Sequence, residues 1–242
     1  MKAAIYTATR NLYKDMIPAI KSLLCNSDVE LVYLGIEDQE FPYDLPDICQ
    51  VIDLSGQKIF DQDGPNMHSH FTYMAMMRAA LVKFLPGDLD RVLSLDVDTI
   101  VDQDISDLWE LPIDDCYFAA SREWHASTER FMYTNVGVCL FNLKKLRDGK
   151  ADEVIRIMNS RQFQWVEQDA LNLLCQCYIY DMPAVYNAHY YTGNPENPKI
   201  IHHIGDNSRL PGYPDVQKYA ALTWAEVMQR RQNEDLNCRT DI

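Results

Sequence analysis

The sequence predicts an α/β fold in which a mostly parallel sheet is flanked by helices. Two apolar runs, residues 3–8 (AAIYTA) and 30–36 (ELVYLGI), have the length and composition of strands. Between them, residues 14–25 place apolar side chains at helical spacing. This strand–helix–strand order predicts parallel strands joined by a right-handed crossover. The length of 242 residues suits one large domain.

The remaining elements continue the alternation of strands and helices. Further strands are expected at residues 50–54, 118–121, 137–143, 179–183 and 199–204, and in the run RVLSL that precedes Asp96. Helices are expected at residues 71–85, 150–159 and 166–177, the first of them ended by Pro86-Gly87. From about residue 215 we expect one amphipathic helix, LTWAEVMQRR. The expected organisation is a domain over residues 1–210 and a short C-terminal helical tail, residues 211–242, packed on it or extending from it.

Charge and motif content exclude several classes of function. Lys and Arg number 22 and Asp and Glu 36, so the net charge is −14. This balance argues against nucleic acid or a membrane surface as a partner, since both are anionic. No G-x-G-x-x-G follows the first strand and no G-x-x-x-x-G-K-[ST] occurs, which disfavours a dinucleotide oxidoreductase and a P-loop enzyme.

The sequence also predicts a location. No stretch approaches the ~20 apolar residues that a membrane span needs, so no integral membrane segment is expected. The start, MKAAIYTATRNLY, has no charged leader followed by a long apolar core, so no secretory signal is expected. The seven cysteines are scattered and odd in number, which favours reduced thiols and a cytoplasmic location.

Two acidic residues, Asp96 and Asp98, directly follow the run RVLSL. Alternate residues of an extended chain point the same way, so both carboxylates can face one point beyond the carboxyl end of the strand, where open α/β sheets bind ligands. Converging carboxylates repel each other unless a cation lies between them, so the pattern favours a hard divalent metal. Acids that merely cap the next turn are the alternative interpretation.

A phosphatase family shares these letters. An apolar strand followed by D-x-D-x-[TV] also opens the haloacid-dehalogenase-like phosphatases, in which the first Asp is a nucleophile and the second a general acid. That motif belongs on the first strand of its fold, whereas here about ninety residues with their own strand–helix–strand pattern precede it. Phosphatase chemistry at Asp96 and Asp98 is therefore kept as an alternative to metal binding.

Five motifs occur in a fixed order between residues 91 and 205. They are RVLSLDVDTIV (91–101), YTNVGVCLFNLKKLR (133–147), EQDALN (167–172), MPAVYN (182–187) and IIHHIG (200–205). In this order they resemble the D-x-D, the Y-F-N-x-G-V block, the D-Q-D-x-L-N, the later Tyr-Asn segment and the I-x-H-F-x-G ending of the family 8 retaining glycosyltransferases. The resemblance spans roughly residues 1–210. It implies a GT-A domain that transfers a hexose, with retention, from a UDP-sugar donor to a glycan or another hydroxyl acceptor.

The resemblance also implies roles for individual residues. Asp96, Asp98 and His202 would hold a divalent metal, and this O,O,N set favours Mn²⁺, with Mg²⁺ as the other candidate. Contacts to the donor would come from Thr7, Ala8, Asn11, Arg78, Val97, Gly205 and Arg209. Catalytic residues around the transferred sugar would be Asn135, Glu167 and Gln168, with Gln168 beneath the anomeric carbon. The region of Glu123 is expected to take part in recognising sugar hydroxyls.

One departure from the family pattern bears on activity. The family usually carries G-x-x-K-P-W after the histidine, and its Lys binds the diphosphate. Here Ser208 stands at that position and Arg209 is one residue further on. A non-catalytic homologue that binds a nucleotide sugar or glycan is therefore an alternative, and a nucleotidyltransferase of similar sheet order is another.

Overall fold

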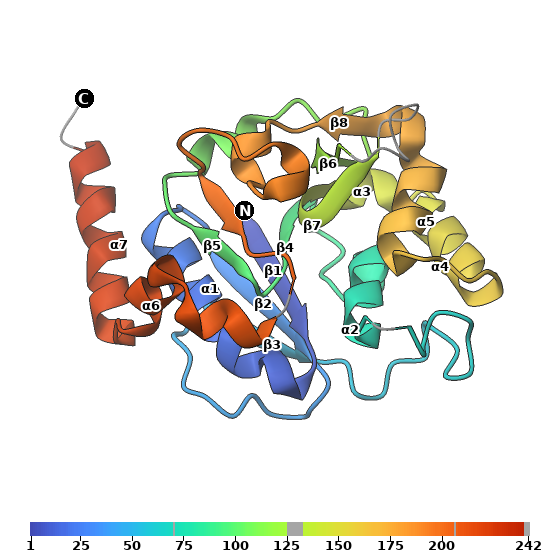
Figure 1. The fold of residues 1–242 in the computed structure, drawn as a ribbon, viewed down its shortest axis with the longest axis horizontal. Helices are drawn as coiled ribbons and strands as arrows, with labels where there is room; N and C mark the ends of the chain where they lie inside the picture. The colour runs from blue at the N-terminus through green and yellow to red at the C-terminus, as the bar shows by residue number, and fades with distance from the viewer. Residues whose placement is uncertain (70, 125–132, 206, 240–242) are drawn as a thin grey trace.

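The chain folds around a mixed sheet that runs through the middle of the molecule (Figure 1), as seen in a computed structural model that describes residues 1–69, 71–124, 133–205 and 207–239. Among these residues the sheet has seven strands in the order β3-β2-β1-β4-β7-β6-β8. Their bounds are β1 Ala3–Ala8, β2 Leu31–Ile36, β3 Cys49–Asp53, β4 Arg91–Leu95, β6 Phe118–Arg122, β7 Thr134–Asn142 and β8 Ile179–Asp181. Strands β1 to β4 run parallel to one another, whereas β7 is antiparallel to its neighbours β4 and β6. The predicted mostly parallel α/β sheet is confirmed.

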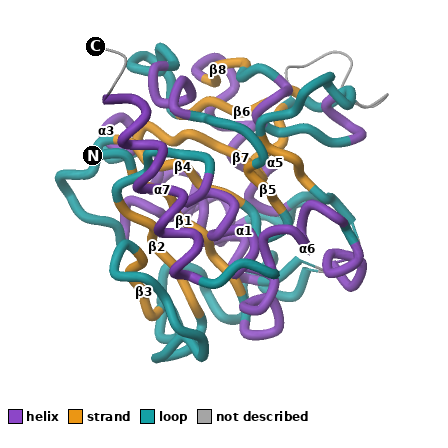
Figure 2. The backbone as a smooth tube through the Cα atoms, turned by 90° about the vertical axis from the view of Figure 1, so that its left-hand side faces the viewer, coloured by secondary structure: helices purple, strands orange, loops and turns teal. Residues whose placement is uncertain are grey.

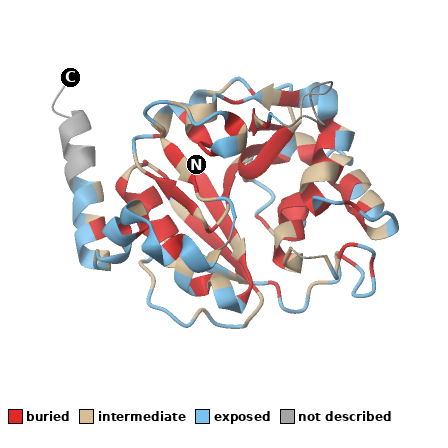
Figure 3. Cartoon of the chain, viewed as in Figure 1, coloured by how far each residue is buried: buried red, intermediate tan, exposed pale blue. Residues whose placement is uncertain are grey.

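Helices cover both faces of the sheet because alternate side chains of its strands point to opposite sides. On β1, Ala4 and Tyr6 face one apolar cluster and Ala3 and Ile5 face the other. The first cluster includes side chains from α1 (Tyr13–Cys25), α6 (Pro214–Ala220) and α7 (Trp224–Arg239). The second includes side chains from α2 (Tyr73–Met76), α3 (Leu143–Leu146), α4 (Lys150–Ser160) and α5 (Val166–Cys175). The central strands are accordingly buried almost throughout (Figure 3).

A second, two-stranded sheet brings the motif IIHHIG (200–205) next to the acidic residues Asp96 and Asp98. Strand β5 (Thr99–Val101) pairs antiparallel with β9 (Ile200–His202), and Thr99 stands opposite His202 in the register. The predicted late strand at 199–204 is thus short, and it lies in this small sheet. Strand β5 itself was not predicted, because the three residues that follow the acids are too few to show a period.

The segment expected as one helix over residues 71–85 is only partly α-helical. The α-helix covers Tyr73–Met76, and Met77–Lys83 winds as a 3-10 helix. Residues 76–81 are all buried, and exposure begins only at the end of the segment, at Lys83. Packing around the buried part outweighs its helical propensity. The tail differs too, since two helices, α6 and α7, replace the single one expected. Both lie against α1 (Figure 2), with Val216 of α6 and Val227 of α7 buried in the first cluster.

None of the helices in the described part of the chain combines the length and apolar character that a bilayer crossing requires.

Candidate active site

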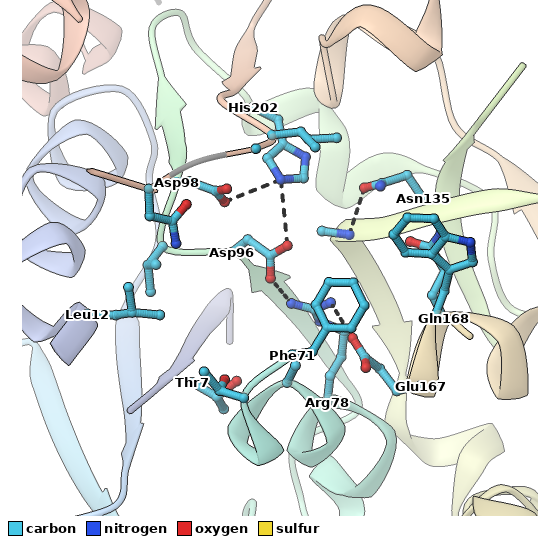
Figure 4. A pocket seen from close by; sticks show the side chains of 18 of the residues that line it. Thr7, Leu12, Phe71, Arg78, Asp96, Asp98, Asn135, Glu167, Gln168 and His202 are labelled. Atoms are coloured by element: carbon cyan, nitrogen blue, oxygen red, sulfur yellow. Dashed lines mark hydrogen bonds and ion pairs between the residues drawn. The ribbon is translucent and has the colours of Figure 1, made fainter. Parts of the chain in front are cut away.

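A cavity of about 540 Å³ opens where several strands end on the same edge of the sheet (Figure 4). Thr7 is the last but one residue of β1, and Asp96 to Asp98 follow β4. Asn135 enters from the start of β7, which reaches the same edge because β7 is antiparallel to β4. The backbone N–H of Asp96 donates to the carbonyl of Gly137 at 2.8 Å, which ties the two strand ends together.

Asp96, Asp98 and His202 converge on one point at the wall of this cavity. One ligand atom from each residue lies within 4.8 Å of the other two. The His202 Nε2 atom is 3.3 Å from Asp98 Oδ1 and 3.6 Å from Asp96 Oδ2. Two carboxylates and one imidazole at this spacing are a donor set that fits a divalent transition metal. The structure thus brings together the three residues that the sequence proposed as ligands.

The imidazole of His202 is held in one orientation by a second polar residue. Its Nδ1 atom is 2.8 Å from Asn187 Oδ1, and a donated Nδ1–H leaves the Nε2 lone pair facing the acids. Burial lowers the pKa of His202, but Asp98 and Asp96 outweigh it, so the pKa lies above its ordinary value. The cluster therefore attracts a cation, either a proton or a metal.

The close approach of His202 depends on a glycine. A Cβ on Gly137 would overlap Cε1 of His202 and lie 2.7 Å from Asp96 Oδ2 and 2.9 Å from Asn135 Oδ1. These contacts are too short for any side chain. Gly137 thus leaves the space in which the three candidate ligands meet, and it forms part of the motif YTNVGVCLFNL.

Arg78 is buried beneath the cluster and holds two carboxylates. Its Nη2 pairs with Asp96 Oδ1, its Nη1 lies 3.3 Å from Glu167 Oε1, and its Nε donates to Ser94 Oγ at 3.2 Å. The side chain also lines the cavity, where its charge is shared between these two carboxylates. Arg78 therefore fixes the orientation of Asp96 in addition to any contact with a donor.

Glu167 is the buried carboxylate that Arg78 holds on the other side. Burial raises the pKa of Glu167 to about 7, although Arg78 acts in the opposite direction. The residue before it, Val166, has φ of 40°, which is unusual for a β-branched side chain. This backbone conformation starts α5 and sends Trp165, Glu167 and Gln168 into the wall of the cavity.

Gln168, Asn135 and Glu123 form a hydrogen-bonded group next to the metal cluster. Asn135 Nδ2 donates to Glu123 Oε1 at 2.7 Å, and Gln168 Nε2 donates to Glu123 Oε2 at 3.3 Å. The Gln168 Oε1 atom accepts from the backbone N–H of Val136 at 3.1 Å, which fixes the amide. The oxygen of Asn135 accepts from Asn187, so this group and the candidate metal ligands belong to one network.

The proposed donor contacts separate into two groups. Thr7, Arg78, Val97 and Gly205 line the cavity, together with the candidate catalytic residues Asn135, Glu167 and Gln168. Ala8, Asn11 and Arg209 are not among its lining residues. Ala8 is buried in the core, Asn11 is exposed and accepts from Thr9 Oγ1 at 2.6 Å, and Arg209 is exposed. Ser208, at the position of the family lysine, also lies outside the lining.

Sequence reasoning missed Asn187 and Tyr191 as residues of the site, and it named Glu123 only through its region of the chain. Asn187 had a signal, because it ends the motif MPAVYN, but nothing in the letters connects it to His202. Glu123 belongs to no motif, and its carboxylate meets Asn135 only because β6 and β7 are neighbours. Tyr191 lines the cavity from a turn of 3-10 helix, Tyr190–Thr192, that has no sequence pattern of its own.

The amino-acid sequence matches a family model and several curated proteins. The sequence model described as "Glycosyl transferase family 8" matches residues 6–209. The curated protein "Glycosyltransferase GlyE" of Streptococcus pneumoniae serotype 4 is 27% identical over 202 residues, which are 77% of this chain and 47% of that protein. The chain spans less than half the length of the curated relatives it matches.

Solved structures place the fold. The crystal structure of GlyE from S. pneumoniae TIGR4 superposes with a TM-score of 0.72 at 20% identity and covers 97% of this chain and 64% of that one. The galactosyltransferase LgtC, solved in complex with donor and acceptor sugar analogs, superposes with a TM-score of 0.69 at 18% identity, over 94% of this chain and 99% of that one. The fold is therefore of the GT-A type.

Proposed function

Since the chain belongs to glycosyl transferase family 8, we propose that it transfers a hexose from a UDP-sugar to a hydroxyl acceptor, with retention and with Mn²⁺ in its site. The observation that carries the proposal is the position of the Asp96–Asp98–His202 cluster in the wall of a cavity that also holds Gln168 and Asn135. A metal-bound diphosphate at the cluster would place the attached sugar beside these amides. Glucose and galactose are the proposed sugars.

The residues present fit the proposed cation. Asp96, Asp98 and His202 would hold it, and the imidazole shifts the preference from Ca²⁺ toward Mn²⁺, with Mg²⁺ as the second candidate. When bound, a divalent metal supplies charge neutralisation for the departing diphosphate. A bound metal would also allow a chain of net charge −14 to hold an anionic donor, because it reverses the sign of the charge at the site.

The remaining chemistry belongs to the polar residues of the chain. In the proposed transfer, the acceptor oxygen bonds to the anomeric carbon while the bond from that carbon to the phosphate oxygen breaks. The electron pair leaves with UDP, and the hydroxyl proton moves to the released phosphate. Gln168, fixed by Val136 and Glu123, would stabilise the positive charge that develops on the sugar, since an amide is a weak nucleophile.

Sugar recognition is proposed for the group around Glu123. Its carboxylate already accepts from Asn135 and Gln168, so it orients both amides toward the cavity. Glu167 lies further in and is engaged by Arg78, so we propose that it acts on the sugar through the position of Arg78 and Asp96. UDP contacts are proposed for Thr7, Val97 and Gly205, which line the cavity.

A second candidate function is non-catalytic binding of a nucleotide sugar or glycan. The observation that favours it is the lack of a basic side chain at Ser208, combined with the position of Arg209 outside the cavity lining. Binding without turnover would require the metal cluster but would release no UDP.

The test has two steps on the intact chain. Calorimetric titration of UDP with and without Mn²⁺ should show binding that requires Mn²⁺ and disappears in Asp98→Asn. UDP release from UDP-glucose and UDP-galactose should then separate the two candidates, because turnover excludes the binding protein. No UDP binding under either condition would reject the donor site, and UDP binding that is unaffected by Mn²⁺ would reject the role of the metal cluster. Phosphate release from simple phosphomonoesters would favour the phosphatase alternative.

A further inference from the structure

Aromatic side chains gather at the mouth of the cavity, beside the residues proposed to hold the sugar. Phe71, Trp165 and Tyr191 are among the lining residues, and Trp165 is 43% exposed. Tyr190 and Trp124 extend this surface outward and are 79% and 65% exposed. We call these five residues the aromatic rim. Large exposed rings next to a cavity mark a binding surface in most proteins.

The rim is built from two ring pairs that come from distant parts of the chain. Phe71 precedes α2 and Trp165 precedes α5, and their ring centroids are 5.7 Å apart (Figure 4 shows Phe71 facing the Glu167 side). Tyr190 and Tyr191 are 5.2 Å apart in an edge-to-face arrangement. Trp124 is tied to the second pair, because its backbone N–H donates to the Tyr191 carbonyl at 2.8 Å.

The second pair is connected to the candidate metal cluster by successive ring contacts. The His189 ring lies 5.3 Å from the His202 ring and 6.0 Å from the Tyr191 ring. Tyr191 in turn contacts Tyr190. His189 and His202 are buried, so Tyr191 and Tyr190 are the rings of this series that can face a molecule entering the cavity from this side.

The charges around the rim select against an anionic partner. Among the cavity-lining residues that the structure describes, four are acidic (Asp96, Asp98, Glu123 and Glu167) and two are basic. The basic residues, Arg78 and His202, are already engaged by carboxylates of this set. Near the rim, Arg122 pairs with Asp181 at 3.1 Å and lies over the Trp124 ring at 5.3 Å. An uncharged partner with flat apolar faces fits this surface best.

We propose that the aromatic rim binds the acceptor, and that this acceptor is an uncharged saccharide of at least two units. The inference rests on the proposed function. The C–H faces of sugar rings pack on aromatic faces, while hydroxyls stay available to polar neighbours and water. One unit would fill the space beside Gln168, and the next would reach Tyr190, which is 79% exposed and not among the cavity-lining residues.

The test compares disaccharides with monosaccharides as acceptors. UDP release is measured with Mn²⁺ and the active UDP-sugar, on disaccharides and methyl monosaccharides of glucose, galactose, mannose, N-acetylglucosamine and N-acetylgalactosamine, and on Ser- and Tyr-containing peptides. The best disaccharide should exceed its monosaccharide in kcat/KM by about tenfold. Tyr190→Ala should reduce that ratio by about five- to tenfold, and Tyr190→Phe should retain it because the ring remains.

A matched control is available at the other end of β6. Tyr178 is 51% exposed and contacts Tyr117, outside the cavity, so Tyr178→Ala should behave like the unmodified chain. The inference is overturned if no disaccharide exceeds its monosaccharide, if a peptide exceeds every saccharide, or if Tyr190→Ala matches Tyr178→Ala. Absence of Mn²⁺-dependent UDP binding would instead reject the proposed function itself.

Discussion

Gly137→Ala tests whether the three candidate ligands depend on close packing at β7. The added methyl group would overlap Cε1 of His202 and lie 2.7 Å from Asp96 Oδ2. Non-bonded carbon atoms normally pack at about 3.5–4.0 Å, so the imidazole must move. The imidazole cannot move freely, because its Nδ1 lies 2.8 Å from Asn187 Oδ1 and because His202 is only 5% exposed.

The expected result follows from this displacement. Mn²⁺ affinity in the presence of UDP should fall by about 10- to 100-fold, the range found when a metal ligand is misoriented. The free energy of unfolding should fall by about 1–3 kcal/mol, as for other overpacked sites. Calorimetry gives the first quantity and urea unfolding the second.

The matched control is Gly87→Ala, in the exposed turn before β4. A Cβ there meets no atom within 4 Å, so both quantities should stay at their original values. If Gly137→Ala binds Mn²⁺ and UDP as tightly as Gly87→Ala does, then the geometry of the cluster does not depend on this glycine and the reasoning is wrong.

Three further outcomes are expected. The pKa of Glu167 is about 7 in the folded chain and 4.5 ordinarily, so the folded state binds more protons than the unfolded state between these values. The free energy of unfolding should therefore fall as pH rises from about 4.5 to about 7. Glu167→Gln should flatten this decline in urea unfolding at pH 5 and pH 8, and an equal decline in both proteins would contradict the assignment. Asn187→Ala should weaken Mn²⁺ binding by about 10-fold by releasing the His202 ring, with unchanged calorimetric affinity as the opposing result. Val227→Ala should lower the free energy of unfolding by roughly 1–3 kcal/mol, because Val227 is fully buried between α7 and the core; no change would mean that α7 adds little to the fold.

Local patterns were enough to predict most of the sheet. The strands β1, β2 and β4 are short apolar runs with clear ends, and α1, α4 and α5 have apolar side chains at helical spacing. Patterns failed where most of a segment is buried, so that no polar face marks its winding. The 3-10 segment Met77–Lys83 has the letters of a helix, but its winding is decided by the elements packed around it.

The candidate site shows the same division. Asp96 and Asp98 could be paired from sequence because they are two residues apart on an extended chain, and His202 was added through a family resemblance. Other contacts of the site join residues that are far apart along the chain. His202 contacts Asp98, and Arg78 contacts Asp96 and Glu167.

The sequence by itself determined the α/β order, the acidic motif and the family, because each of these is written in short, local patterns. Only the tertiary structure decided which side chains share the cavity. The antiparallel β7 brings Asn135 and Gly137 to the end of β4, and the β5–β9 pair brings His202 there. Strand pairing and loop packing also bring Glu123, Asn187 and Tyr191 into the site, because they set distances that residue spacing does not encode.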